Sequence, residues 1–306
     1  MQNTTRGVGG TLHGAEQRPA SADSHPPDAI QRILQYRPWM ERLRYVGTEL
    51  MPAMRDRAAD AEKLRTVIEQ NDEVHARLII AFRSSVYRTK PEVSTLTDAI
   101  IQHGPAHVRC LAVSAAVSDL FRPDAAIGDY RRSHLWRHSV WVATVARMIA
   151  RRRKILRPDR AFLGGLLHDI GIILEERCVP EKFANMLAVL PGDKPLPDTE
   201  REYLGTDHAE IGDRVAETCA FPPTVRAAIR YHHSTEGYRE EDAAIIQCVE
   251  MANVICTLRG AAAIDNARVA TPKGAAAALN LRKQEFRELA ADLGRKSAHC
   301  EMLSNL

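Results

Sequence analysis

Residues 161–171 read AFLGGLLHDIG, an apolar run that holds the pair His168-Asp169 near its end. The run predicts a buried helix, and burying an imidazole or a carboxylate without a partner is costly. Two such groups side by side therefore favour metal ligands. The alternative is that His168 caps the helix and Asp169 forms a surface ion pair, since short motifs often carry no chemistry.

The glycines of this run are predicted to serve two purposes. Gly171 is placed to end the helix in a left-handed conformation. The His-Asp pair would then lie at the negative end of the helix dipole, which favours a cation. Gly164 and Gly165 lie one turn before the pair and would let another helix approach closely.

The overall composition is that of a soluble protein. Its 306 residues, 45% of them hydrophobic, suffice for a sizeable core in one or two domains. The net charge of +3, from 42 basic and 39 acidic residues, requires no nucleic-acid partner. The six cysteines form no Cys-x-x-Cys pair, and we see no membrane span or signal-peptide core. We therefore expect a cytoplasmic protein with no membrane partner.

Apolar residues recur three and four positions apart from residue 29 onward, which predicts an all-α fold. Residues 1–27 are rich in Gly, Ser, Thr and Pro, so we expect them to be disordered, with His13 and His25 solvated. The expected parts are a disordered segment over 1–27, an N-terminal helical part over 28–121, a helical core over 122–260 and a C-terminal helical appendage over 261–306.

Further histidines fall on successive predicted helices of the core. His138 lies on the apolar face of a helix over about 131–152, where a lone histidine is otherwise a hydrogen-bonded core residue. Asp207 with Glu210 three residues on predicts a helix start at His208. The candidate ligands are His138, His168, Asp169, His208, His232, His233 and, as a weak ligand, Asn253. Nitrogen and carboxylate ligands together suit iron, manganese or zinc, and a bridging carboxylate suits a pair of metals.

Two features outside this set remain open. The basic run over 151–154 is most simply a solvated helix end that complements the dipole. A site for an anionic ligand or a nucleic acid is the less favoured interpretation. His299 and Cys300 lie close to the C-terminus, and no other candidate ligand stands at a motif-like spacing from them. They therefore give little indication of a site.

Taken together, these positions resemble the HDOD family, a branch of the HD-domain superfamily of metal-dependent phosphohydrolases. The resemblance covers about residues 48–260, and its clearest runs are WRHS at 136–139, AFLGGLLHDIG at 161–171 and GTDHAEIG at 205–212. It implies an HD-domain-like helical bundle with an N-terminal helical subdomain.

The resemblance also implies ligand roles. Residues that match the ligands of the first site are His138, His168 and Asp169, with Asp169 bridging. Those that match the additional ligands of relatives that cleave cyclic dinucleotides are His208, His232 and His233.

Two departures from the active enzymes bear on activity. The superfamily's last aspartate falls at Asn253, and the lysine of active cyclic-dinucleotide phosphodiesterases falls at Ile172. Their Gly-Tyr-Pro signature is absent after His233. An amide supplies no negative charge to a divalent ion, and isoleucine cannot neutralise a phosphate.

We therefore expect a bacterial-type signal-transduction module that acts through contacts with signalling proteins. It would bind a divalent metal or a nucleotide and would hydrolyse little or nothing. The alternative is an active phosphohydrolase on a cyclic dinucleotide or nucleotide. A nucleic-acid-binding protein is a third interpretation and rests only on residues 151–154. The oligomeric state is left open, a homo-oligomer included.

Overall fold

The computed structural model describes residues 29–35, 37–52, 59–87, 92–190, 194–236, 238–265, 272 and 274–306. Over these ranges the fold is all-α, as the apolar spacing predicts. The β-structure described is one antiparallel pair of two-residue strands. The predicted disorder of 1–27, with His13 and His25, lies outside the described residues.

The elements follow one another along the chain without a central sheet among the described residues. The first elements are α1 (Ala29–Leu34), α2 (Arg37–Tyr45), the π-helix η1 (Val46–Leu50), α3 (Ala59–Glu69), α4 (Asp72–Arg83), α5 (Leu96–His103), α6 (Pro105–Ser118), the 3-10 turn η3 (Asp119–Phe121), β1 (Ala126–Ile127) and β2 (Tyr130–Arg131). The helices of the centre are α7 (Arg132–Arg152), α8 (Pro158–Leu167), α9 (Ile170–Cys178), α10 (Pro180–Leu187), α11 (Leu196–Leu204), α12 (His208–Thr218), α13 (Pro223–Tyr231) and α14 (Ala243–Leu258). The last helices are α15 (Ala275–Ala278), α16 (Lys283–Arg295) and α17 (Ser297–Ser304).

Local sequence signals account for several of these boundaries. Thr95 caps α5 through a capping box with Asp98, as expected for a helix that starts there. Gly104, with φ of 81°, ends that helix, and a proline opens α6 directly after it. The Asp207 side chain accepts a hydrogen bond from the Glu210 amide, so α12 begins at His208 as predicted.

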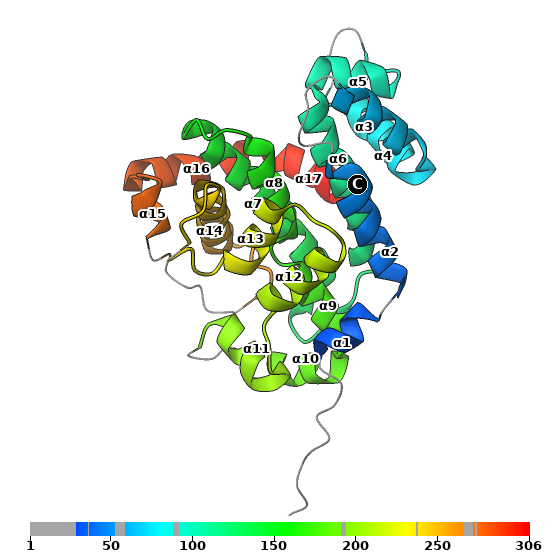
Figure 1. Cartoon of the computed structure of the whole chain (residues 1–306). Coiled ribbons are helices and arrows are strands. Elements are labelled where there is room, and N and C mark those ends of the chain that lie inside the picture. The colour runs from blue at the N-terminus through cyan, green and yellow to red at the C-terminus, as the bar shows by residue number, and fades with distance from the viewer. Residues whose placement is uncertain are drawn as a thin grey trace, which may run out of the picture.

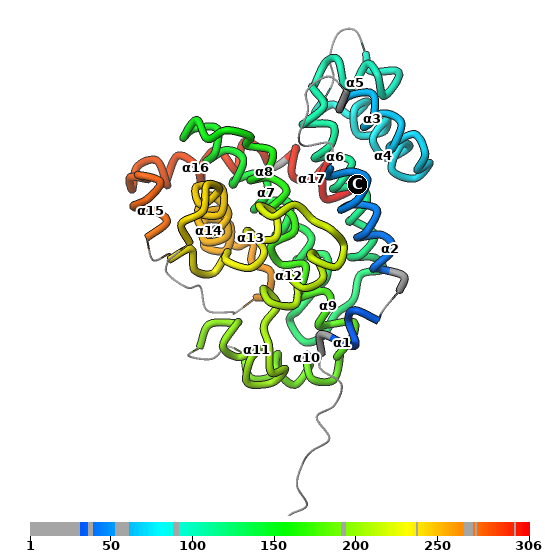
Figure 2. The backbone as a smooth tube through the Cα atoms, viewed as in Figure 1, coloured from blue at the N-terminus to red at the C-terminus, as the bar shows by residue number. Residues whose placement is uncertain are grey.

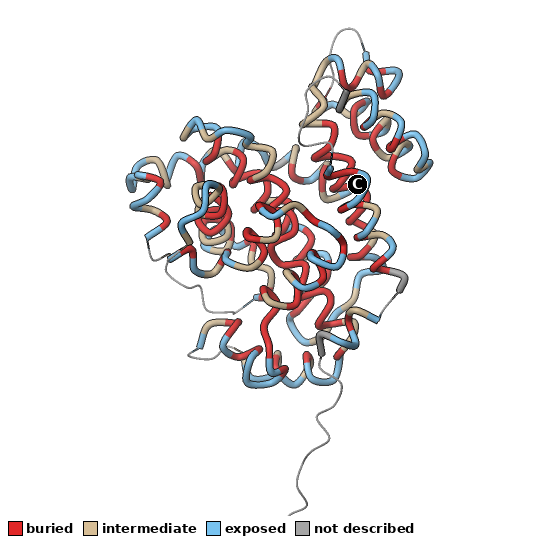
Figure 3. The backbone as a smooth tube through the Cα atoms, viewed as in Figure 1, coloured by how far each residue is buried: buried red, intermediate tan, exposed pale blue. Residues whose placement is uncertain are grey.

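The long helix α7 lies at the centre of the fold, packed between α8 and α14 (Figure 1). Buried positions concentrate along α7, α8 and the neighbouring helices, whereas α3 and α4 at the edge keep exposed faces (Figure 3). One apolar cluster joins residues from Ile33 to Leu306. The division into helical parts over 28–121, 122–260 and 261–306 stays a prediction.

No helix in the described ranges is long and apolar enough to span a bilayer.

The last helix of the described chain lies against helices from earlier parts of the chain. The final helix α17 packs on α6 and α7, so segments distant in sequence lie side by side (Figure 2). The indole nitrogen of Trp136 donates a hydrogen bond to the Ser304 carbonyl oxygen at 3.0 Å. The predicted appendage is therefore anchored to the centre.

The glycines of the 161–171 run act mainly through close packing. A Cβ on Gly165 would lie 2.9 Å from the backbone of Ala143 in α7, so the predicted close approach of a helix is confirmed. The prediction for Gly171 is wrong, because this residue lies in the first turn of α9 and has no left-handed conformation. A Cβ there would lie 1.9 Å from the His208 carbonyl oxygen. Gly171 thus lets α12 approach α9.

We expect Gly171→Ala to destabilise the protein by about 1–3 kcal/mol, the usual cost of overpacking, because α12 and His208 must move away. The matched control is Gly294→Ala, since Gly294 is also helical but has nothing within 4 Å of the added Cβ. The control should be neutral or slightly stabilising. Urea unfolding of both variants measures the difference, and equal stabilities would contradict this role for Gly171.

Candidate metal centre

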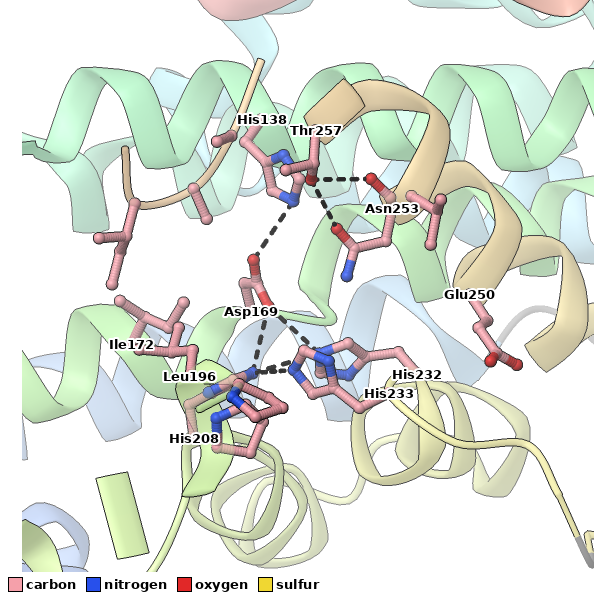
Figure 4. Close-up of a pocket in the computed structure, with 16 residues that line it drawn as sticks. His138, Asp169, Ile172, Leu196, His208, His232, His233, Glu250, Asn253 and Thr257 are labelled. Atoms are coloured by element: carbon pink, nitrogen blue, oxygen red, sulfur yellow. Dashed lines mark hydrogen bonds and ion pairs between the residues drawn. The ribbon is translucent and has the colours of Figure 1, made fainter. Parts of the chain in front are cut away.

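Six of the seven predicted ligands gather in one centre, five histidines around Asp169. Figure 4 shows Asp169 with four of these histidines, His138, His208, His232 and His233. They come from four places in the chain. His138 lies in α7, the pair His168-Asp169 forms the joint between α8 and α9, His208 is the first residue of α12, and His232-His233 follows α13. Asp169 is only 4% exposed, so the alternative of a surface ion pair does not hold.

One carboxylate oxygen of Asp169 faces the first pair of histidines. Asp169 Oδ2 lies 3.4 Å from His138 Nε2 and 3.1 Å from His168 Nε2. The two imidazole nitrogens are 3.2 Å apart. These three atoms form a compact triangle that could hold one ion.

The other oxygen faces the second group. Asp169 Oδ1 lies 3.5 Å from His208 Nε2 and 3.3 Å from His232 Nε2. His208 Nε2 is in turn 3.2 Å from His232 Nε2 and 2.8 Å from His233 Nε2. Metal bonds of about 2.1 Å place neighbouring ligand atoms about 3.0–3.4 Å apart in octahedral or tetrahedral geometry. The spacing in both groups therefore fits atoms around a common ion, with Asp169 shared.

The hydrogen bonds behind the ligands fix the state of three imidazoles. The Nδ1 atoms of His138, His168 and His232 each donate to a backbone carbonyl oxygen, at 2.6, 2.8 and 2.8 Å. A carbonyl only accepts, so these rings carry their proton on Nδ1 and present the Nε2 lone pair to the centre. Burial lowers the pKa of His168 to about 4, which keeps that ring neutral. Lone pairs that face one another repel, and a bound cation removes that repulsion.

His208 is held by a carboxylate instead. Glu200 Oε2, on α11, accepts hydrogen bonds from His208 Nδ1 at 2.6 Å and from the His208 amide at 3.1 Å. Burial alone would lower the pKa of His208, but the Glu200 carboxylate outweighs it and raises that pKa to about 9. A carboxylate behind a ligating imidazole fixes the ring and makes it a stronger donor to a metal.

Two buried acids of this supporting layer were not predicted. Glu200 and Glu175 are both fully buried, and burial together with the charge of Glu200 raises the pKa of Glu175 well above its ordinary value. A signal was present for Glu200, since Leu196, Glu200 and Leu204 recur every four residues and place this acid in an apolar stripe.

The centre opens into a narrow cavity of about 70 Å³. Asn253 lines it from α14, and its side-chain oxygen accepts a hydrogen bond from Thr257 Oγ1 at 3.4 Å. Asn253 thus lies in the wall of the same cavity as His138 and Asp169. Ile172 forms part of the wall, and no lysine or arginine is among the described residues that line the cavity.

Solved structures share this fold over most of the chain. An HDOD domain protein of unknown function from Geobacter sulfurreducens matches with a TM-score of 0.70 and 22% identity, over 91% of this chain and 98% of that one. A protein provisionally named a phosphohydrolase, from Shewanella amazonensis, matches with a TM-score of 0.68 and 20% identity, over 92% of this chain and 98% of that one. At such identities the likeness shows the fold alone.

Other matches cover less of the relative. A protein provisionally named a signal transduction protein, from Marinobacter aquaeolei, has a TM-score of 0.68 and 23% identity, over 85% of this chain and 58% of that one. An uncharacterized protein of Treponema pallidum is 28% identical over 130 residues, which are 41% of this chain and 25% of that protein. The chain thus spans a quarter of that curated relative. The family model described as HDOD domain matches residues 40–235, and the chain belongs to the HDOD family.

Proposed function

We propose that this protein is a regulatory HDOD module of bacterial-type signal transduction that binds a pair of divalent metals and acts through contacts with signalling proteins. One observation carries the proposal: five histidines surround the buried Asp169, whereas none of the described residues lining the cavity beside it is a lysine or an arginine. Besides the metals, a hydrolase of phosphate esters gains rate from lysine or arginine side chains that stabilise the charge developing on the phosphate. The centre is thus better suited to holding metal than to turning over a phosphate ester.

The size of the cavity points the same way. Small-molecule sites usually measure about 300–1,000 Å³, whereas the space beside Asp169 is about 70 Å³. Ile172 lines the cavity at the position where the active phosphodiesterases have the lysine that neutralises a phosphate. A cyclic dinucleotide would not reach Asp169 without a rearrangement of α11, whose first residues also line the cavity.

The chemistry of the donors selects the class of metal. Imidazole nitrogens with one carboxylate suit iron, manganese or zinc. Such an ion, when bound, would acidify a coordinated water. We assign the stronger site to Asp169, His208, His232 and His233 and the weaker one to His138, His168 and Asp169, which has the neutral Asn253 nearby. Free cysteines at all six positions agree with a cytoplasmic location.

The second candidate function is an active metal-dependent phosphohydrolase, and the shared carboxylate between two histidine groups favours it. The deciding experiment measures phosphate-ester hydrolysis by protein loaded with manganese, iron or zinc, on cyclic dinucleotides and nucleotides, with Asp169→Ala as the reference. The regulatory proposal expects no turnover above that reference. Turnover at enzyme rates, of about 1 per second or more and lost in Asp169→Ala, would replace the regulatory proposal with the hydrolase.

We expect Asn253→Asp to strengthen metal binding at the weaker site by about tenfold, because a carboxylate adds the negative charge that the amide lacks. Asn253 lies next to that site in the cavity wall. The control is Asn71→Asp, which alters a helix cap on α4 far from the centre. Calorimetric titration with manganese measures both, and an unchanged second binding step in Asn253→Asp would contradict the assignment.

A further inference from the structure

A second cavity, of about 390 Å³, lies on the other side of α7 from the metal centre. Its walls come from the turn after α4, from α6 and α7, and from the last two helices. The lining residues with polar or charged side chains are Tyr87, His107, Thr144, Arg147, Arg151, Arg295, Lys296 and His299. The cavity therefore sits where the first, central and last segments of the chain meet.

Its charge is positive and only partly compensated, since among these cations Arg295 pairs with Asp292. Within the described ranges no carboxylate lies at salt-bridge distance from Arg147, Arg151 or Lys296. Arg147 is only 8% exposed, so its charge is largely removed from water. A buried cation without a counter-charge is costly, and an anionic ligand would offset that cost.

The residues of the basic run over 151–154 have different surroundings. Arg152 pairs with Asp292, and Arg153 pairs with Glu285 at 2.8 Å, both acids being on α16. Both arginines therefore form ion pairs at the end of α7, and Arg152 is exposed. Arg151 instead lines the cavity.

The hydrogen bonds of the cavity floor leave donors free for a ligand. Arg147 can only donate, so His107 Nδ1 accepts its hydrogen bond at 3.0 Å. His107 therefore carries its proton on Nε2 and donates to the Tyr87 hydroxyl oxygen at 3.1 Å. The Tyr87 hydroxyl hydrogen is left to donate in turn. His299 Nε2 is also buried without a hydrogen-bond partner among the described residues, although His299 showed little signal in the sequence.

We propose that this cavity binds a small phosphate-bearing ligand of mononucleotide size. The phosphate would be held by Arg147, Arg151 and Lys296, and a flat ring by the aromatic edge of Tyr87 and the His299 ring, whose centroids are 5.5 Å apart. The volume lies within the range of small-molecule sites, in contrast to the narrow cavity at Asp169, which has no lysine or arginine among its described lining residues. The site is independent of the metal centre and supplies a place at which an input could act.

The test measures calorimetric binding and thermal unfolding with pyrophosphate, AMP and GMP, with adenosine as the uncharged reference. We expect the phosphate-bearing probes to bind and to raise the unfolding temperature, because a ligand that binds the native state stabilises it. Adenosine should bind at least about tenfold more weakly, since it lacks the charge-assisted hydrogen bonds. The double variant Arg151→Gln, Lys296→Gln should lose at least about tenfold in AMP affinity for the same reason.

Both altered residues are exposed at the rim, so the variant should fold, which circular dichroism checks. Lys182→Gln controls for the loss of charge, because Lys182 is exposed on α10 at the opposite end of the fold (Figure 1). Asp169→Ala should bind AMP like the unaltered protein. The proposal is overturned if no probe binds, if the double variant binds AMP unchanged, or if Asp169→Ala loses AMP binding. Tight binding of an oligonucleotide with no binding of any mononucleotide would also overturn it.

Discussion

The Asp169→Ala variant is expected to lose both metals together. One carboxylate oxygen faces His138 and His168, and the other faces His208 and His232, so a single side chain serves both groups. Affinity at each site should fall by at least about 100-fold, since even outer-shell partners of ligands are worth 10- to 100-fold. Elemental analysis of protein purified without chelator, followed by manganese titration, measures the loss.

The loss should occur without unfolding. Three of the histidines keep their hydrogen bonds to backbone carbonyl oxygens when Asp169 is removed, and these bonds anchor the rings to the helices. Asp72→Ala is the control, because Asp72 is an exposed acid on α4 and contacts no histidine of the centre. Far-ultraviolet circular dichroism should be the same for both variants. Retention of one metal in Asp169→Ala would show that the carboxylate does not bridge the two groups.

The helix starts and the buried helix face that place these ligands could be predicted from the sequence, because each depends on residues close together in the chain. Asp207 marks the start of α12 through its own hydrogen bond to Glu210, and a proline opens α13. Apolar spacing on α7 put His138 on the buried face, where it is found with 1% exposure. In each case the chemistry within a few residues decides the outcome, so no knowledge of the tertiary fold is needed.

Features that depend on contacts between distant segments were not readable in the same way. Gly171 looked like a helix terminator, because a glycine after a helical run serves either a left-handed turn or a close contact, and only the position of His208 distinguishes them. The second cavity depends on α17 packing beside α6 and α7, which brings His299 to Arg147. Nothing in the spacing of these residues indicates that they meet.

Glu200 is the buried group whose removal should cost most outside the ligands themselves. It is fully buried and accepts two hydrogen bonds from His208, one from the ring and one from the backbone. Glu200→Gln keeps the size and an accepting oxygen but removes the charge that makes His208 a strong ligand. We expect metal affinity at the site containing His208 to fall by about 10- to 100-fold, with the site containing His138 unchanged.

Glu202→Gln is the matched control, because Glu202 lies on the same helix but is exposed and pairs only with Lys194 among the described residues. An exposed pair of this kind contributes little, about 0–1 kcal/mol, so metal binding should not change. A two-step calorimetric titration with manganese separates the two sites. If Glu200→Gln weakened both steps equally, Glu200 would be acting on the packing of α11 and α12 as a whole. A selective loss of the stronger step, absent in Glu202→Gln, would mean that the buried charge acts through the His208 ring.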